Sequence, residues 1–89
     1  MDYSIEFAPA AERDLKALPK PIQLQIGRRI DKLAADPRPH GVEKIKSEDD
    51  LYRVRQGDYR ILYAIQNKKL TIIIVKIGDR KEVYRRLPK

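Results

Sequence analysis

The amino-acid sequence predicts an α+β protein of order β-α-α-β-β-β, in which two amino-terminal helices pack on one face of a small, mainly antiparallel sheet. Three observations predict this fold class. The chain opens with an alternation of apolar and polar residues, continues with two segments of helical periodicity, and ends with three strand-like runs joined by short turns. Because a chain of 89 residues has room for one hydrophobic core, residues 1–89 are expected to form a single domain.

The first half of the chain carries one strand and both helices. Residues 3–7 alternate between apolar and polar side chains, which is the period of a half-buried strand. A first helix begins near Pro9, since proline suits the first helical turn. Its apolar stripe is Ala11, Leu15 and Leu18. A second helix is predicted from Pro21 to Ala35, with Ile22, Ile26, Ile30 and Leu33 toward the sheet and Arg28, Arg29 and Lys32 facing away.

The second half is predicted to be extended throughout. A short piece near Val42 to Lys46 precedes three strands, which cover Leu51 to Arg55, Tyr59 to Ile65 and Leu70 to Ile77. The turns between them fall at residues 56–58 and 67–69. The last strand is apolar at nearly every position, as in a strand covered on both faces, so it is expected to be internal with the first strand on its far side.

Composition favours a polyanionic partner and excludes several kinds of site. The net charge is +7, and residues 76–89 alone contribute +4, a pattern that attracts nucleic acid. With no cysteine in the chain, disulfides, thiol catalysis and cysteine-based zinc sites are excluded, and we expect neither metal nor cofactor. No apolar run approaches the roughly 20 residues that span a bilayer, so the protein is expected to be cytoplasmic, without a membrane partner.

Three arginines are predicted to share one face of the sheet. Arg53 and Arg55 point the same way because side chains alternate along a strand. A two-residue turn at Gln56-Gly57 or Gly57-Asp58 puts Arg60 on that face too, opposite one of them. The other face is apolar and aromatic: Tyr52, Val54, Tyr59, Ile61 and Tyr63. Opposed like charges destabilise a sheet, so the arrangement favours a phosphate site, unless the arginines only meet solvent or pair with acids such as Asp58 and Glu43.

Two runs, Asp50 to Tyr63 and Ile77 to Tyr84, resemble the RelE branch of the RelE/ParE toxin superfamily. The resemblance covers almost the whole chain. It implies a RelE-like fold and the toxin of a type II toxin-antitoxin system, an mRNA endoribonuclease that inhibits translation. The expected partners are mRNA in the ribosomal A site and a RelB-like antitoxin, which would form a heteromeric complex with the chain. The expected reaction is attack of a ribose 2′-hydroxyl on the adjacent phosphate.

The same resemblance implies roles for individual residues. Arg60 matches the family arginine that holds the scissile phosphate. Arg80 matches the arginine that stabilises that phosphate or protonates the leaving oxygen, and Tyr84 matches the tyrosine that stacks on or orients the nucleotide. Further RNA or phosphate contacts are expected from Arg53, Arg55, Lys44, Lys46 and Lys81.

The identity of the general base is left open by the sequence. Arginine is a poor proton acceptor, and Asp79 stands where many relatives carry histidine. Glu43 resembles a glutamate that serves as base in the YoeB-like branch, with an exposed strand-edge carboxylate as the alternative interpretation, and His40 is expected on the surface. The competing functions are a ParE-like DNA gyrase inhibitor and a nuclease-inactive nucleic-acid-binding module.

Overall fold

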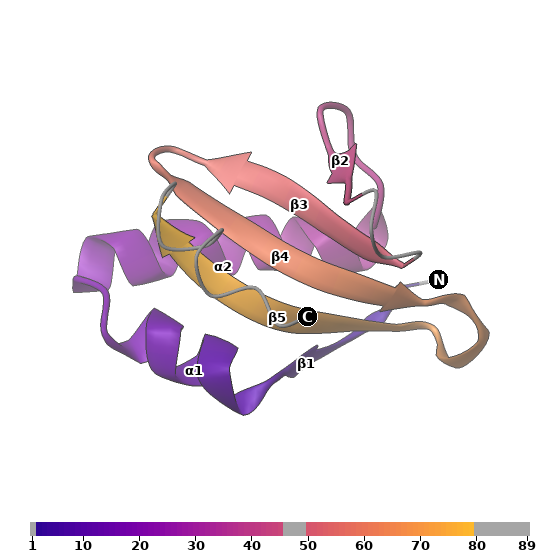
Figure 1. Ribbon diagram of the computed structural model, residues 1–89, viewed down its shortest axis with the longest axis horizontal. Coiled ribbons are helices and arrows are strands. Elements are labelled where there is room, and N and C mark those ends of the chain that lie inside the picture. The colour runs from indigo at the N-terminus through magenta and orange to yellow at the C-terminus, as the bar shows by residue number, and fades with distance from the viewer. Residues whose placement is uncertain (1, 46–49, 80–89) are drawn as a thin grey trace.

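The structure is a computed structural model and describes residues 2–45 and 50–79. These residues form one mixed sheet and two helices (Figure 1). The elements are β1 (Ser4–Phe7), α1 (Pro9–Lys16), α2 (Lys20–Ala35), β2 (Glu43–Lys44), β3 (Leu51–Gln56), β4 (Tyr59–Gln66), the 3-10 turn η1 (Asn67–Lys69) and β5 (Thr71–Asp79). The strand order is β1-β5-β4-β3-β2. The predicted α+β class and the internal position of the last strand are confirmed: β1 pairs with β5 in parallel, and the other pairs are antiparallel.

Both helices contribute to one core with the sheet. α2 passes behind the strands and α1 lies beside β5 (Figure 1). Ala11 of α1 is buried, as are Ile26, Ile30 and Leu33 of the stripe predicted on α2. The prediction that Arg29 faces away from the sheet is wrong in part. Its side chain is half-buried, and its Nε atom is buried without a hydrogen-bond partner among the described residues. No helix in the described part of the chain is long and apolar enough to cross a membrane.

The hairpin of β3 and β4 closes on a two-residue turn, Gly57-Asp58. Gly57 has a φ of +62°, in the left-handed region that hairpin turns of this kind require. Gln56 therefore pairs with Tyr59, and Arg55 with Arg60. The helix side of the hairpin is the apolar one, with Tyr52, Val54, Ile61 and Tyr63 buried. The predicted separation of an arginine face from an apolar face is confirmed, and Arg55 is the residue opposite Arg60.

A β-bulge interrupts the pairing of β4 with β5. Tyr63 pairs with Ile74, whereas the preceding Leu62 pairs with Lys76, so Val75 is the extra residue. The bulge places Ile74 and Ile77 on the helix side although they are three residues apart, and it turns Lys76 to the other face. β5 begins at Thr71, one residue later than predicted, because Leu70 has a left-handed φ of 49° and belongs to the turn.

Two stacked tyrosines hold the connection that follows α2. The rings of Tyr52 and Tyr63 lie 6.0 Å apart between centroids. The Tyr63 hydroxyl donates to the Pro37 carbonyl at 2.7 Å, and Arg38 Nε donates to the Tyr52 hydroxyl at 3.2 Å. Burial of the Tyr63 phenol raises its pKa above the ordinary value. The Pro-rich connection is therefore tied to β3 and β4 a few residues before β2, which it delivers to the edge of the sheet.

Candidate functional site

A small polar cavity of about 230 Å³ lies at the β2 end of the sheet. Its lining consists of Gly41, Glu43, Arg53, Arg55 and Arg60. The arginines come from β3 and β4, and alternation along the strands puts all three on the face opposite the buried tyrosines. The structure thus brings together the three arginines that the sequence places on one face.

Glu43 enters the cavity from the edge strand β2, where it lies opposite Arg53 in the sheet register. Arg53 Nε donates to Glu43 Oε1 at 2.7 Å, and Nη2 of the same guanidinium contacts the same oxygen. The Arg53 side chain is 22% exposed and that of Glu43 is 63% exposed. Of the two acids considered from the sequence, Asp58 and Glu43, it is Glu43 for which the structure gives a pair with Arg53.

Arg55 and Arg60 form a cross-strand pair of like charges. Arg55 is exposed and Arg60 is half-buried. Like charges directly opposite each other destabilise a sheet, so the pairing of Arg55 with Arg60 does not itself stabilise the fold. An anion between two guanidinium groups removes this repulsion and receives forked hydrogen bonds from both. The cavity is therefore suited to a phosphate group.

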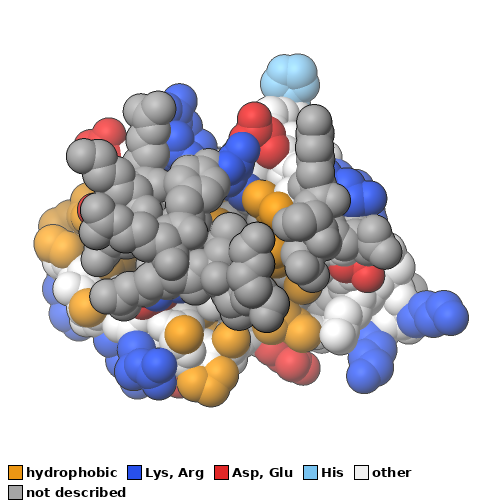
Figure 2. All heavy atoms as spheres, in the orientation of Figure 1, with side chains coloured by type: hydrophobic (Ala, Val, Ile, Leu, Met, Phe, Trp, Pro, Cys, Tyr) orange, Lys and Arg blue, Asp and Glu red, His pale blue; other side chains and the backbone are white. Residues whose placement is uncertain are grey.

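Of the remaining candidate residues, those that the structure describes do not line this cavity. Lys44 is exposed on β2 and lies opposite Tyr52, so alternation turns it to the other face from Glu43. His40 is exposed at the periphery, where Figure 2 shows the single histidine in pale blue. Four of the predicted residues lie outside the described residues: Lys46, Arg80, Lys81 and Tyr84. Within residues 2–45 and 50–79, no group of three or more acidic or histidine side chains could hold a metal ion.

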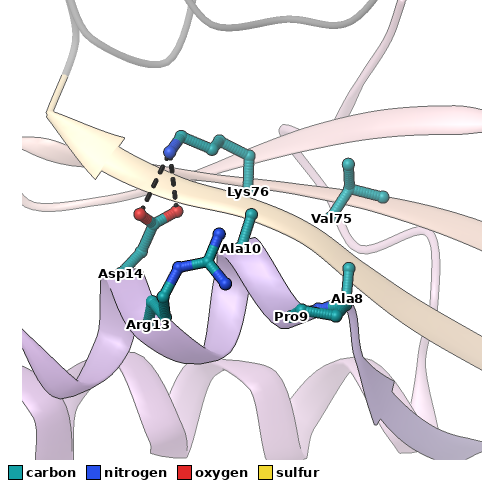
Figure 3. A pocket seen from close by; sticks show the side chains of 7 residues that line it. All are labelled: Ala8, Pro9, Ala10, Arg13, Asp14, Val75 and Lys76. Carbon is teal, nitrogen blue, oxygen red and sulfur yellow. Dashed lines mark hydrogen bonds and ion pairs between the residues drawn. The ribbon is translucent and has the colours of Figure 1, made fainter.

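A second cavity of about 510 Å³ lies between α1 and β5, and its lining includes a buried ion pair (Figure 3). Lys76 Nζ lies 3.0 Å from both carboxylate oxygens of Asp14, and Asp14 Oδ2 also accepts the Ile77 backbone N–H at 3.1 Å. Pairing of β1 with β5 ends at Phe7 and Ile74, so Asp14 occupies the edge of β5 just beyond that point.

The sequence pattern does not predict this ion pair. Its one signal is a lysine inside an otherwise apolar strand, and 62 residues separate the two partners. Gly78, two residues after Lys76, pairs with Arg60 across the sheet. The ion pair therefore anchors α1 to the part of β5 that adjoins the arginine cavity.

In chemical terms, the described residues of the cavity offer phosphate binding and one carboxylate. The guanidinium groups can hold a phosphodiester and neutralise charge that develops on it, but they stay protonated and accept no proton. Among the described residues that line the cavity, Glu43 is the side chain that can accept a proton. Because Arg53 engages only Oε1, the hydrogen bonds that hold the carboxylate leave its other oxygen for a further contact.

Comparison with known proteins gives concordant matches over nearly the whole chain. Residues 5–84 match the family described as ParE toxin of type II toxin-antitoxin system, parDE. Toxin RelG of Mycobacterium tuberculosis is 30% identical over 97% of this chain and 100% of its own length. The putative toxin RelE1 of Methanocaldococcus jannaschii is 31% identical over 96% and 98%. In the archaeal RelE-RelB complex from Pyrococcus horikoshii, a chain 31% identical superimposes with a TM-score of 0.79, covering 91% of this chain and 98% of that one.

Proposed function

The chain belongs to the ParE toxin family of type II toxin-antitoxin systems and is of the RelE type, and from this premise we propose that it cleaves messenger RNA in the ribosomal A site. The observation that carries the proposal is the cavity formed by Arg53, Arg55 and Arg60. Three guanidinium groups on one sheet face are unfavourable for folding, whereas they match the charge and geometry of a phosphodiester backbone. Cleavage of this bond would stop translation.

In the proposed reaction, the ribose 2′-oxygen attacks the adjacent phosphorus and forms a new P–O bond, while the bond to the 5′-oxygen of the next nucleotide breaks. Glu43 takes the proton of the 2′-hydroxyl, since it is a carboxylate that lines the cavity beside the arginines. Arg60 and Arg55 hold the phosphate oxygens and offset the negative charge that grows in the transition state. The products are a 2′,3′-cyclic phosphate and a 5′-hydroxyl.

Residues outside the described ranges complete the proposal through the family resemblance. Arg80 stabilises the reacting phosphate or supplies the proton that the leaving 5′-oxygen requires, and Tyr84 orients the nucleotide. Lys46 and Lys81, with Lys44, provide further attraction for the RNA backbone. No metal or cofactor takes part in this scheme.

A RelB-like antitoxin is the proposed protein partner. The similar chain from Pyrococcus horikoshii is part of a RelE-RelB complex, and the Mycobacterium tuberculosis RelBE2 toxin-antitoxin complex contains another. An acidic or amphipathic segment that folds on binding would complement a toxin of net charge +7 and would inhibit it by covering the arginine face.

The proposed function is tested by cleavage of mRNA on programmed ribosomes under single-turnover conditions. Arg60→Ala is expected to slow cleavage by about 10²- to 10³-fold, the usual effect of removing a preorganised charge from a transition state. Lys20→Ala, at the start of α2 and away from the cavity, is the control for loss of one positive charge and should cleave at the parent rate. Cleavage by folded Arg60→Ala at the parent rate would contradict the assigned site.

Inhibition of DNA gyrase is the second candidate, because the matching family is named for ParE toxins. Expression of the chain without antitoxin separates the candidates. Truncated messenger RNA with arrested translation supports the nuclease, whereas intact messenger RNA with double-stranded DNA breaks supports the gyrase inhibitor. RNA binding without any cleavage would identify a nuclease-inactive binding module.

A further inference from the structure

The arginine cavity contains its own anion. Glu43 lies in it with three guanidinium groups, and both contacts from Arg53 converge on its Oε1. An arginine fork binds either a carboxylate or a phosphate, so the two anions compete for the same donors. The position that Glu43 takes on Arg53 is one that an RNA phosphate could also take.

The ion pair is built so that it can be exchanged. Glu43 stands on a strand of two residues at the edge of the sheet, and its side chain is 63% exposed. An exposed pair contributes little to stability, since water screens the attraction and ordering two long side chains costs entropy. The Arg53 side chain is only 22% exposed and extends from the middle of a six-residue strand, so it stays in place when the carboxylate leaves.

We infer that Glu43 is an internal counter-ion of this cavity, which a phosphate of the RNA substrate displaces from Arg53. While the cavity is empty, the carboxylate offsets part of the repulsion among the three arginines. When RNA binds, the phosphate takes the Arg53 donors, and the carboxylate turns away from Arg53 toward the ribose, where it can still accept the 2′-hydroxyl proton. Glu43 thereby lowers the affinity of the toxin for polyanions in general and favours an RNA that places a phosphate close to Arg53.

This inference rests on the proposed RNA-binding function, but it concerns binding and is independent of the base role of Glu43. Its expected signature is a gain of affinity on Glu43→Gln, which keeps the size of the side chain and removes its charge. One unit charge a few ångströms from a bound phosphate, in surroundings close to water, corresponds to about a threefold to tenfold change in affinity. Because the phosphate takes the Arg53 donors in both proteins, the number of neutralised phosphates is the same, and the slope of log K against log salt should change little.

The experiment measures binding of a 2′-O-methyl RNA oligonucleotide, which cannot be cleaved, by fluorescence anisotropy at several salt concentrations. Glu6→Gln is the matched control, because Glu6 is an exposed carboxylate on β1, the opposite edge strand, and its loss gives the same net charge. The pair Arg53→Gln and Arg53→Gln/Glu43→Gln tests the partner: without Arg53, the further removal of Glu43 should raise affinity less than it does in the parent chain. Circular dichroism verifies that each variant is folded.

Tighter binding for Glu43→Gln than for Glu6→Gln, with the effect reduced in the Arg53→Gln background, would support the counter-ion. Equal affinities of Glu43→Gln and Glu6→Gln would overturn it, because only net charge would then matter. Weaker binding by Glu43→Gln would also overturn it, since Glu43 would then contribute to the RNA contact. If the parent chain binds no RNA at low salt, the proposed function fails and the counter-ion inference fails with it.

Discussion

Replacing Asp14 with alanine is expected to destabilise the fold by about 3 to 5 kcal/mol, which is the effect of removing one partner from a buried ion pair. The side chains of Lys76 and Asp14 are only 9% and 18% exposed, so water screens the interaction weakly. The substitution leaves the Lys76 ammonium buried without its carboxylate (Figure 3). It also removes the acceptor of the Ile77 N–H at the edge of β5. A lost hydrogen bond of this kind accounts for about 1 kcal/mol of the total.

The measurement is urea-induced unfolding followed by circular dichroism, with Glu12→Ala as the control on the same helix. Glu12 forms a pair with Lys16 at 3.7 Å, but these side chains are 61% and 75% exposed. An exposed i,i+4 pair contributes about 0.3 to 0.5 kcal/mol, so the two substitutions should differ by several kcal/mol.

A second variant separates the charge effect from simple loss of packing. Lys76→Met in the Asp14→Ala background removes the stranded ammonium and should restore much of the lost stability, because an apolar side chain of similar length tolerates burial. A loss below 1 kcal/mol for Asp14→Ala would refute the reasoning. So would a double variant less stable than Asp14→Ala alone, since the buried charge would then not be the cause of the destabilisation.

Three other predictions concern stability and the arginine pair. Arg55→Ala should leave the free energy of unfolding unchanged or raise it by about 0.5 kcal/mol, since Arg55 is exposed and lies opposite Arg60. The same substitution should weaken RNA binding measured by anisotropy. A clear loss of stability would contradict this prediction. Leu70→Asn should stabilise the fold by about 0.5 to 1 kcal/mol in thermal unfolding, because Leu70 has a left-handed φ of 49°, which asparagine adopts more readily, and is 39% exposed. Unchanged or lower stability would show that the contacts of the leucine side chain contribute more than the relief of backbone strain. The free energy of unfolding should fall as pH rises above about 10, the ordinary tyrosine pKa, because burial raises the pKa of Tyr63 and the phenol therefore loses its proton first in the unfolded chain. Tyr63→Phe should flatten this pH dependence in urea titrations at several pH values. An equally steep curve for the variant would refute the assignment to Tyr63.

The arginine face could be predicted because it depends on local geometry alone. Alternation along a strand puts Arg53 and Arg55 on one face, and any two-residue turn returns Arg60 to that face. The choice between two turn registers required the structure, in which Gly57 takes the left-handed position and Arg55 becomes the residue opposite Arg60. The sequence predicted that the three arginines share a face, but it did not decide whether Arg53 or Arg55 lies opposite Arg60.

Two features of the structure were not predicted from the sequence. Asp14 and Lys76 are far apart in the chain, and a bulge at Val75 changes which face Lys76 occupies, so simple alternation gives the wrong side. Arg29 looks like a solvent-facing residue on the helical pattern, yet its Nε is buried. Periodicity reports which face of an element is apolar, but it does not report what packs at the margin of that face.

Periods of 2.0 and 3.6 residues, together with short turns, are enough to predict the order of the elements, the apolar stripes of the helices, the internal position of β5 and the arginine face. The contact of Glu43 with Arg53 and the position of Asp14 at the edge of β5 depend instead on how the chain packs in three dimensions. These contacts depend on how a long connection lays β2 against β3 and how α1 docks beside β5. Such placements are set by the packing of the whole core and by the loss of pairing where β1 ends, and no local pattern in the sequence encodes them.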